Sequence, residues 1–366
     1  MTNETRNKID ELKEAIIKVI AFFDMFDYAL TDWEIWRMLG VQCEFFEVVE
    51  KLEEMHKSPL PPLVKGGENG FYFLPGREKN IIERLNRYNF ADRKFKRAVF
   101  VSKFFRFIPW VKMIAVGNLL GAHNLKDGSD IDFFIIAEDK RIWLARFFCA
   151  GIAKIAGWRP KNGDSRDKIC LSFYASAGAM DLSGLMMKGK ETNPPYPPLL
   201  KGAEFVNPPY PPLLKGAEFV NPPYPPLLKG AEFVDIYFIY WLAGLSLVYD
   251  AGGIYEKFLS ANSWLKNYLP NWRLRVQSPK RRVKPFLSEF YHDAADLLIG
   301  GLEPQFKKLQ IKFLPLKLKN LMNKDTRVVV DDKIIKLHAN DRREEYAARH
   351  EEKMRLLRRA ITRFSQ

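Results

Sequence analysis

The N-terminal part of the chain places apolar and polar residues with helical spacing. Apolar side chains recur every three or four positions between residues 8 and 57, which predicts three short amphipathic helices. The second begins at Thr31, where Glu34 completes a capping box, and the third covers residues 43–56. A stretch rich in proline and glycine follows, and residues 71–74 form a short apolar run typical of a strand. Three helices and a hairpin favour a winged-helix-like module, with a small helical packing module as the alternative.

One long basic helix is expected at residues 77–108, directly after this N-terminal module of residues 1–76. Apolar positions are interleaved with the basic ones, so the helix would connect the module to a following sheet. We expect a solvated connector, and a face that contacts nucleic acid is the alternative. The positive residues in question are Arg84, Arg87, Arg93, Lys94, Lys96, Arg97, Lys103 and Arg106.

The centre of the chain, residues 109–192, alternates short apolar runs with a helical pattern. Three apolar runs predict strands, and an amphipathic stretch between the last two predicts a helix. Together they predict an α+β fold built on a small mixed sheet with helices. The strands are expected at residues 111–116, 131–137 and 168–175, the helix at 139–156, and a further short helix from about residue 118.

A proline-rich repeat separates this centre from the C-terminal region. The 14-residue unit Asn-Pro-Pro-Tyr-Pro-Pro-Leu-Leu-Lys-Gly-Ala-Glu-Phe-Val occurs three times without a mismatch over residues 193–234. Such units are too short and too rich in proline for a solenoid, whose repeats have about 20 or more residues. Identical copies indicate a recent duplication that is tolerated as a flexible surface insertion, where proline favours extended polyproline II. A docking site for a proline-recognising domain is the alternative.

Deleting residues 193–234 is expected to leave folding and activity nearly intact, because an extended insertion contributes little to an apolar core. The melting temperatures of the deletion variant and the full chain test this. A fall well beyond the roughly 2–4 °C that 1 kcal/mol produces in a medium-sized domain would contradict the prediction.

Beyond the repeat, residues 235–366 predict a mostly helical C-terminal region. Three stretches are expected to form helices, the first of them apolar and buried, and a charged helix follows near the end. Residues 327–338 instead alternate in the manner of a β-hairpin, with two aspartates at its turn. The helices are expected at residues 235–249, 255–269, 284–302 and 341–363.

Charge and composition limit the classes of partner and the cellular locations that we expect for the chain. The formal net charge is +14, and residues 273–366 hold 23 Lys and Arg against 12 Asp and Glu. A polyanion such as nucleic acid or a phosphorylated substrate is therefore a candidate partner, and a solvated basic surface is the alternative. The three cysteines have neither metal-binding nor disulfide spacing. With no signal-peptide pattern and no apolar stretch near the roughly 20 residues that span a bilayer, we expect a cytoplasmic protein without membrane contact.

Two carboxylates open the second apolar run of the centre. Asp130 and Asp132 lie two positions apart, so on a strand both would point to one face, close enough to hold one or two Mg²⁺ ions. Upstream, the first apolar run ends in Gly117 and Asn118, where glycine permits close backbone approach and a helix N-terminus would offer free N–H groups to phosphate. With Ser129, these residues predict a site for metal and nucleoside triphosphate. A turn built on a chance Asp-x-Asp is the alternative.

The stretch from residue 116 to 136 resembles the signature of the DNA polymerase β-like nucleotidyltransferase superfamily. That signature has Gly-Ser or Gly-Gly after an apolar strand and Asp-x-Asp opening the next strand. Gly117 and Asn118 match the first pair, and Ser129, Asp130 and Asp132 match the second. The whole chain apart from the repeat is also similar to uncharacterised bacterial proteins that join a winged helix, such a core and a helical C-terminal region.

The resemblance implies a polymerase-β-like core flanked by a winged-helix module and a helical C-terminal region. It implies that Asp130 and Asp132 are catalytic and bind Mg²⁺, and that Gly117, Asn118 and Ser129 bind the nucleotide. The resemblance does not indicate the acceptor.

Three departures from the superfamily pattern bear on activity. Asn118 replaces the usual serine, and its amide can still hydrogen-bond a phosphate. An arginine often found a few residues later is missing, and residues 119–124 offer His123 instead. The third carboxylate, which is implied to help activate the attacking hydroxyl, belongs on the strand at 168–175, where this chain has Ser172 and no acid. The nearest acids in the sequence are Asp164, Asp167 and Asp181.

Two further groups are weaker candidates. Lys126 could contact phosphate, with a solvated loop lysine as the alternative. A polar cluster after the hairpin could meet substrate, although capping the last helix is the role we expect for its Asn340 or Asp341. The cluster comprises His338, Asn340, Asp341, Arg342 and Arg343.

The sequence thus predicts a Mg²⁺-dependent nucleotidyltransferase. It would move a nucleoside monophosphate from ATP or another NTP to a hydroxyl of an unidentified acceptor. The alternative is a catalytically weak or inactive nucleotide-binding protein that acts as a DNA-binding or protein-interaction regulator. The helix at residues 43–56 argues against insertion into a DNA groove, because it is mostly acidic where a recognition helix is expected to be basic.

Overall fold

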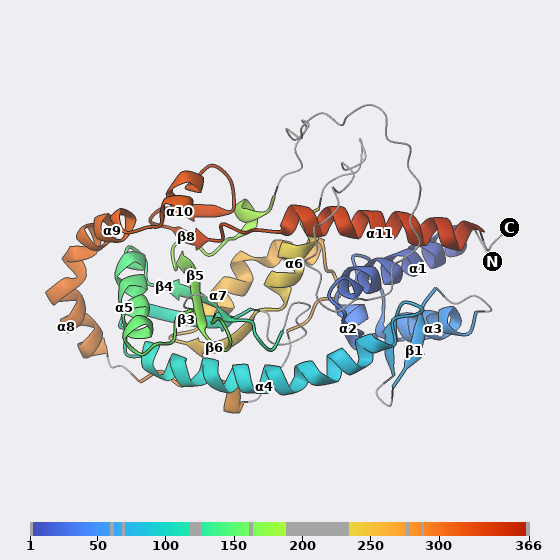
Figure 1. The fold of residues 1–366 in the computed structure, drawn as a ribbon, viewed down its shortest axis with the longest axis horizontal. Coiled ribbons are helices and arrows are strands. Elements are labelled where there is room, and N and C mark those ends of the chain that lie inside the picture. Colours follow the sequence, from blue (N-terminus) through green and yellow to red (C-terminus); the bar gives the residue numbers. More distant parts are fainter. Residues whose placement is uncertain are drawn as a thin grey trace.

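The described part of the chain has a mixed α and β architecture around one mixed sheet, as predicted (Figure 1). The proline-rich repeat and residues 118–125 lie outside the described residues. The flexible insertion and the short helix expected from residue 118 therefore stay predictions. The computed structural model describes residues 3–58, 62–67, 70–117, 126–160, 164–187, 234–274, 279–286 and 289–363.

The N-terminal module contains three helices followed by an antiparallel hairpin, in the predicted order. The capping box is confirmed, because the Glu34 N–H donates to Thr31 Oγ1 at 3.2 Å and the Thr31 N–H donates to Glu34 Oε2 at 3.1 Å. Leu30, between the first two helices, also pairs with Tyr72 of the hairpin. The elements are α1 (Asn3–Asp24), α2 (Asp32–Arg37), α3 (Phe45–His56), β1 (Val64–Gly66) and β2 (Phe71–Phe73).

Six strands form the central sheet in the order β6-β3-β4-β5-β8-β7. β4 and β5 run parallel and are joined by helix α5, and the other neighbouring pairs are antiparallel. The first two predicted strands are confirmed with their bounds, and the third is shifted by one residue. The elements are β3 (Val111–Val116), β4 (Ile131–Ala137), α5 (Ile142–Ile155), β5 (Ile169–Ser176), β6 (Ser246–Asp250), β7 (Val328–Val330) and β8 (Ile334–Leu337).

Alternate residues of the strands enter two separate apolar cores, one on each face of the sheet. On β4, Phe134 and Ile136 belong to one core, and Phe133 and Ile135 belong to the other. The face of Phe133 packs against α5 and the long helix α4, whereas the face of Phe134 packs against α6 and α7 (Figure 1). Asp132 shares the face of Phe134, two positions away. The three helices are α4 (Lys79–Phe105), α6 (Ile236–Ala243) and α7 (Ile254–Ala261).

The apolar stretch at residues 235–249 is not one helix, contrary to the prediction. α6 ends at Ala243, and the chain continues as strand β6, which pairs with β3. Leu247 and Val248 of β6 are buried in opposite cores, so the strand is apolar at successive positions. Periodicity alone does not distinguish such a strand from a buried helix.

The rest of the C-terminal region is more broken than predicted. The helix expected at residues 255–269 is divided between α7 and a 3₁₀ turn, and the one expected at 284–302 is shorter. The hairpin at 327–338 and the charged last helix are confirmed. The remaining elements are the 3₁₀ helices η1 (Ser183–Leu185), η2 (Ser263–Asn267), η3 (Pro279–Arg281) and η4 (Gly300–Leu302), and the helices α8 (Glu289–Ile299), α9 (Glu303–Lys312), α10 (Leu316–Leu321) and α11 (Arg343–Arg363).

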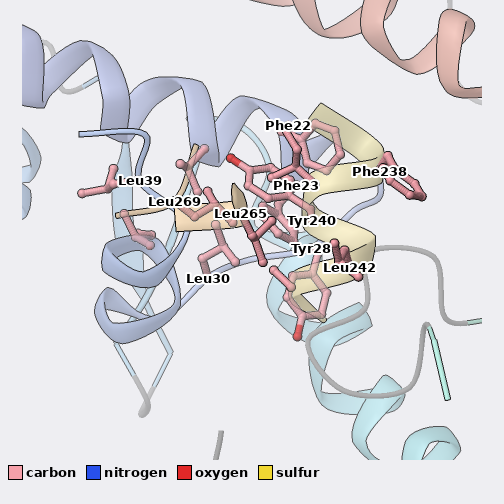
Figure 2. Close-up of a cluster of buried hydrophobic side chains, with 14 of the residues drawn as sticks. Phe22, Phe23, Tyr28, Leu30, Leu39, Phe238, Tyr240, Leu242, Leu265 and Leu269 are labelled. Carbon is pink, nitrogen blue, oxygen red and sulfur yellow. The ribbon is translucent and has the colours of Figure 1, made fainter. Parts of the chain in front are cut away.

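The N-terminal module shares its apolar core with the C-terminal region. Figure 2 shows Phe22 and Phe23 of α1 beside Tyr240 of α6, and the rings of Phe22 and Tyr240 meet edge to face with centroids 4.8 Å apart. The last helix, α11, lies alongside α1 (Figure 1). There His350 Nε2 donates to the Lys18 carbonyl at 2.9 Å. The module is therefore packed against the rest of the chain over two separate segments.

Acidification is expected to weaken this contact through His350. Burial, and to a lesser degree the nearby positive Lys18 and Lys353, lowers the pKa of His350 to about 4. Because the unfolded chain binds this proton more readily, the stability that the neutral imidazole confers is present above pH 6.5 and is lost as the pH falls towards 4. At pH 5 the loss should be roughly 2 kcal/mol. Urea unfolding at pH 7.5 and pH 5 measures it.

The matched variant for that experiment is His350→Gln, whose amide can still donate to the Lys18 carbonyl but does not titrate. The variant should lose less stability than the wild type between the two pH values. An equal loss in both proteins would contradict the assignment of this pH dependence to His350.

Helix α4 is only in part the solvated connector that its composition predicts. Arg84, Arg87 and Lys94 are buried, and their charges meet partners inside the molecule. Arg84 binds the Glu34 carboxylate through both terminal nitrogens, at 2.6 and 3.0 Å, and Arg87 donates to a backbone carbonyl of the N-terminal module at 2.7 Å. The helix runs along the length of the molecule, so its inner face passes both the module and the sheet (Figure 1). These three cations therefore stabilise the fold through contacts inside the molecule.

Across the residues that the structure describes, no helix combines the length and the apolar character needed to cross a membrane. The cytoplasmic location expected from the sequence stays a prediction.

Candidate functional site

Asp130 and Asp132 lie together at the start of β4, with Cys170 of β5 beside them. One possible ligand atom from each of the three residues lies within 4.8 Å of those of the other two. The backbone register explains the trio, because Cys170 is directly opposite Asp132 in the parallel pair of strands. Burial raises the pKa of the Asp130 carboxyl, although Lys94 opposes that rise. The pair therefore concentrates negative charge in a partly buried place.

Helix α4 holds the loop that carries the acid pair. The Lys94 ammonium is fully buried, donates to the Ser129 carbonyl and pairs with Asp167 Oδ1 at 3.0 Å. Arg93 adds ion pairs to Asp127 at 2.5 Å and to Asp167 at 2.8 Å. These contacts tie the loop before β4 and the loop before β5 to one helix, so α4 helps to set the position of the acid pair.

Replacing Lys94 with methionine is expected to destabilise the protein by about 3 kcal/mol, because Asp167 and the Ser129 carbonyl lose a buried partner. Urea unfolding measures the change. Lys96→Met is the control on the same helix, since Lys96 is exposed and pairs with Asp92 one turn away, and its loss should cost less than about 1 kcal/mol. Equal effects of the two substitutions would contradict the role of Lys94.

Gly117 directly follows β3 and lies beside Asp132, at a position where a side chain would meet Trp241. Its N–H donates to the Asp132 carbonyl at 3.0 Å, which extends the ladder between β3 and β4. A Cβ atom at this position would lie 2.8 Å from Nε1 of Trp241 on α6. The glycine thus admits the indole next to Asp132. Because the Gly117 N–H already donates within the sheet and the indole fills the space beside its Cα, the predicted contact of Gly117 with nucleotide stays a prediction.

A cavity of about 340 Å³ opens beside Asp132. Its apolar wall is a set of stacked rings, in which Trp241 stacks against Phe173 and against Phe238 with an interplanar angle of 14° in each pair. Tyr237 and Tyr346 form a second stacked pair in the lining, with ring centroids 5.0 Å apart. A volume of this size is in the range of small-molecule sites. A planar, partly apolar ligand would meet aromatic surface there.

Three cations lie on the other side of the cavity: Lys336 belongs to β8, and Arg342 and Arg343 belong to the polar cluster after the hairpin. Lys336 pairs with Asp341 at 3.0 Å, and Arg343 pairs with Asp341 at 2.9 Å and with Asp235 at 2.7 Å. Burial, together with the nearby Arg343, lowers the pKa of Lys336 to about 8. Arg342 is half-exposed and forms an ion pair with Glu345. The lining therefore carries three cations and two carboxylates, Asp132 and Asp341, and each cation is paired with a carboxylate.

The capping role expected for Asp341 is supported, because its Oδ1 accepts the backbone N–H of Arg343 at 3.1 Å where α11 begins. Asn340 instead accepts a hydrogen bond from Lys317 at 2.6 Å. The structure places this cluster in the lining of the cavity beside Asp132, and its contact with substrate stays a prediction. The sequence gives no local sign of two further lining residues. It missed Lys336 and Trp241, because nothing local to either residue indicates that β8 and α6 face the acid pair.

Two polar side chains complete the lining between the acids and the basic side. Ser172 Oγ lies 2.6 Å from His338 Nε2 and 3.1 Å from Cys170 Sγ. Ser172 is on β5 and His338 follows β8, which is the neighbouring strand. Burial lowers the pKa of His338 to about 4, so the imidazole is neutral near pH 7. A continuous row of polar groups therefore runs from the acid pair through Cys170 and Ser172 to His338.

The other residues predicted for the site have different outcomes. Asn118 lies outside the described residues, so its predicted contact with nucleotide is untested. The Ser129 hydroxyl donates to the Lys126 carbonyl at 2.9 Å and shapes the loop before the acid pair. None of the three acids near β5 completes a carboxylate trio in the described site: Asp164 pairs with Lys168 at 3.4 Å, Asp167 pairs with Arg93 and Lys94, and Asp181 accepts from Trp264 at 3.1 Å.

The donor set fits a hard divalent cation such as Mg²⁺. Two carboxylates from one strand face are the ligands that Mg²⁺ takes from proteins, with the remaining positions filled by water or phosphate oxygens. Cys170 is a poor ligand for such an ion. Burial, and then the charges of Asp132 and Asp130, raises the pKa of its thiol well above the usual value, which keeps the sulfur protonated. Asp130 and Asp132 are therefore the residues that could hold such an ion.

Comparisons of this chain with protein families, with curated proteins and with solved structures found no match. The case for a function therefore depends on the geometry of the site and on the sequence pattern.

Proposed function

We propose that the chain binds a nucleoside triphosphate with Mg²⁺ in this cavity and transfers the nucleoside monophosphate to a hydroxyl, with release of pyrophosphate. The observation that carries the proposal is the acid pair at the edge of a cavity with an aromatic wall and three cations on its other side. Such a cavity complements the three parts of the ligand, which are a metal-bound phosphate, an anionic tail and a planar base. When bound, Mg²⁺ would neutralise charge that develops on the phosphate oxygens.

The protein's own groups have separate roles in this proposal. Asp130 and Asp132 bind the metal ion and fix its position on β4. Arg342 attracts the phosphates, since it is the half-exposed cation of the lining. The rings of Trp241 and Tyr237 contact the base. Positioning of this kind accounts for most of the catalysis of phosphoryl and nucleotidyl transfer, where proteins do little covalent chemistry.

We further propose that β3, β4, α5 and β5 form a polymerase-β-like core and that α1 to β2 form a winged helix. The order of elements supports the first part, because a glycine ends β3, two aspartates open the antiparallel β4, and α5 leads to the parallel β5. The helix and hairpin order, with the added pairing of Leu30 and Tyr72, supports the second.

A regulator that binds nucleotide without turnover is the second candidate, and the missing third carboxylate favours it. A role in reading DNA with α3 has less support. The surface of α3 forms part of a cavity of about 500 Å³ lined by Glu11, Glu47, Glu50 and Glu54, and an acidic surface repels the phosphate backbone.

The test uses the full chain, each of the four common ribonucleoside triphosphates, and Mg²⁺ or EDTA. Calorimetry should show nucleotide binding that requires Mg²⁺, and pyrophosphate release should follow with at least one triphosphate. If the chain binds nucleotide but releases no pyrophosphate, with or without added hydroxyl compounds, the function of a nucleotide-binding regulator would be favoured over that of a transferase. Absence of binding to all four triphosphates would reject the proposed function.

A further inference from the structure

One hydroxyl in the cavity lining, next to Cys170 and the acid pair, belongs to the protein itself. Ser172 lines the same cavity as Asp132, and its Oγ is linked to the acid pair through the single side chain of Cys170. The position results from an irregularity in the sheet. Asp132 pairs with Cys170 but Phe134 pairs with Phe173, so β5 has one more residue than β4 over this interval. Such a bulge redirects a side chain, and here Ser172 reaches the cavity.

Ser172 is also next to a base. His338 Nε2 lies 2.6 Å from Ser172 Oγ, within hydrogen-bond reach of a group that can take its proton. The neutral imidazole can accept that proton. The pKa of His338 is about 4, which is close to the pKa of about 3.9 of an ordinary aspartate. The polymerase-β-like pattern places a carboxylate of that kind on this strand. His338, which follows the neighbouring strand β8, can thus act as the base in place of a carboxylate on β5.

We propose that Ser172 is an acceptor of the nucleotidyl group, so that the protein modifies itself at this residue. This inference rests on the proposed binding of a nucleoside triphosphate. Ser172 Oγ forms a bond to the α-phosphorus, the bond between that phosphorus and the bridging oxygen to the β-phosphate breaks, and pyrophosphate leaves with the electron pair. The Oγ proton passes to His338 Nε2 and then to solvent. The product is a phosphodiester that joins serine to a nucleoside.

Geometry favours Ser172 over an external hydroxyl as the group that His338 activates. The observed contact of Nε2 is with Ser172, so an external acceptor would have to displace the serine to reach the same nitrogen. The modified side chain would occupy the cavity from within. Attachment of one nucleoside monophosphate should therefore also block binding of a second triphosphate, and the reaction should stop after one group is added.

The experiment incubates the full chain with ATP and Mg²⁺, and then with the other triphosphates, and follows intact mass and peptide maps. We expect the mass of a single nucleoside monophosphate on the peptide that contains Ser172. EDTA and Ser172→Ala should each abolish the addition, and His338→Gln should slow it by about 100-fold or more. Ser176→Ala is the matched control on the same strand, because its hydroxyl donates to Asp139 at 2.7 Å, and it should be modified like the wild type.

The outcomes separate this inference from the proposed function. Wild-type protein that binds MgATP, or releases pyrophosphate with an added hydroxyl compound, but carries no adduct would overturn the inference and leave the function standing. An adduct mapped to another residue of the wild type would also overturn the inference, whether or not the variants fold. Failure to bind any triphosphate would reject the function and the inference together.

Discussion

Asparagine at both Asp130 and Asp132 is expected to abolish Mg²⁺-dependent nucleotide turnover. The substitution keeps the shape of both side chains but removes the two negative charges that would hold the ion. Loss of about 4 kcal/mol of transition-state stabilisation, a typical contribution of a metal ion, corresponds to a rate decrease of about 1000-fold. Pyrophosphate release and calorimetric binding of Mg²⁺-ATP measure the two consequences separately.

Stability provides the internal check on that double variant. Burial disfavours the charged form of Asp130, and the two carboxylates lie close to each other, so removing both charges should not lower the melting temperature in EDTA. Addition of Mg²⁺ should raise the melting temperature of the wild type but not of the variant. Asp164→Asn is the control, since this exposed acid lies outside the site and should retain full turnover. Equal turnover in the wild type and the double variant would contradict the metal site.

Strands β3 and β4, which form the site of the acid pair, could be predicted from the sequence because a local apolar run marks each of them. The run from residue 111 to 116 and the run from 131 to 137 are bounded by glycine turns and charged residues, and their ends match the structure. The hairpin near residue 330 was likewise predicted from alternation and from its Asp331-Asp332 turn. These local patterns do not indicate which strands pair with one another in the sheet.

The rest of the candidate site depends on pairings between distant parts of the chain. β8 lies beside β5 although more than 150 residues separate them, and this pairing brings His338 to Ser172. α6 places Trp241 against Gly117 in the same way. The misread segment at 235–249 has a related cause, because β6 is buried on both faces and its apolar run resembles a helix. Contacts between distant segments of this kind produce no periodic pattern in the sequence, so they could not be predicted from it.

Replacing Cys170 with aspartate is expected to create the third carboxylate that the sequence lacks. Cys170 is opposite Asp132 in the sheet, and its sulfur already lies within 4.8 Å of both carboxylates. A third carboxylate there would give the site one more hard oxygen ligand and one more negative charge. We expect Mg²⁺ to bind the variant at least about tenfold more tightly, which corresponds to about 1.4 kcal/mol.

The stability of the Cys170→Asp variant should depend strongly on the metal ion. In EDTA three neighbouring carboxylates repel one another in a partly buried place, so the variant should melt below the wild type. Saturating Mg²⁺ should raise its melting temperature by more than it raises that of the wild type, because the ion binds the folded variant more tightly. Cys170→Asn is the matched control, since it has the same shape without the charge and should gain no Mg²⁺ affinity. If the aspartate and asparagine variants respond equally to Mg²⁺, position 170 does not face the metal site, and the third carboxylate must be sought on another strand.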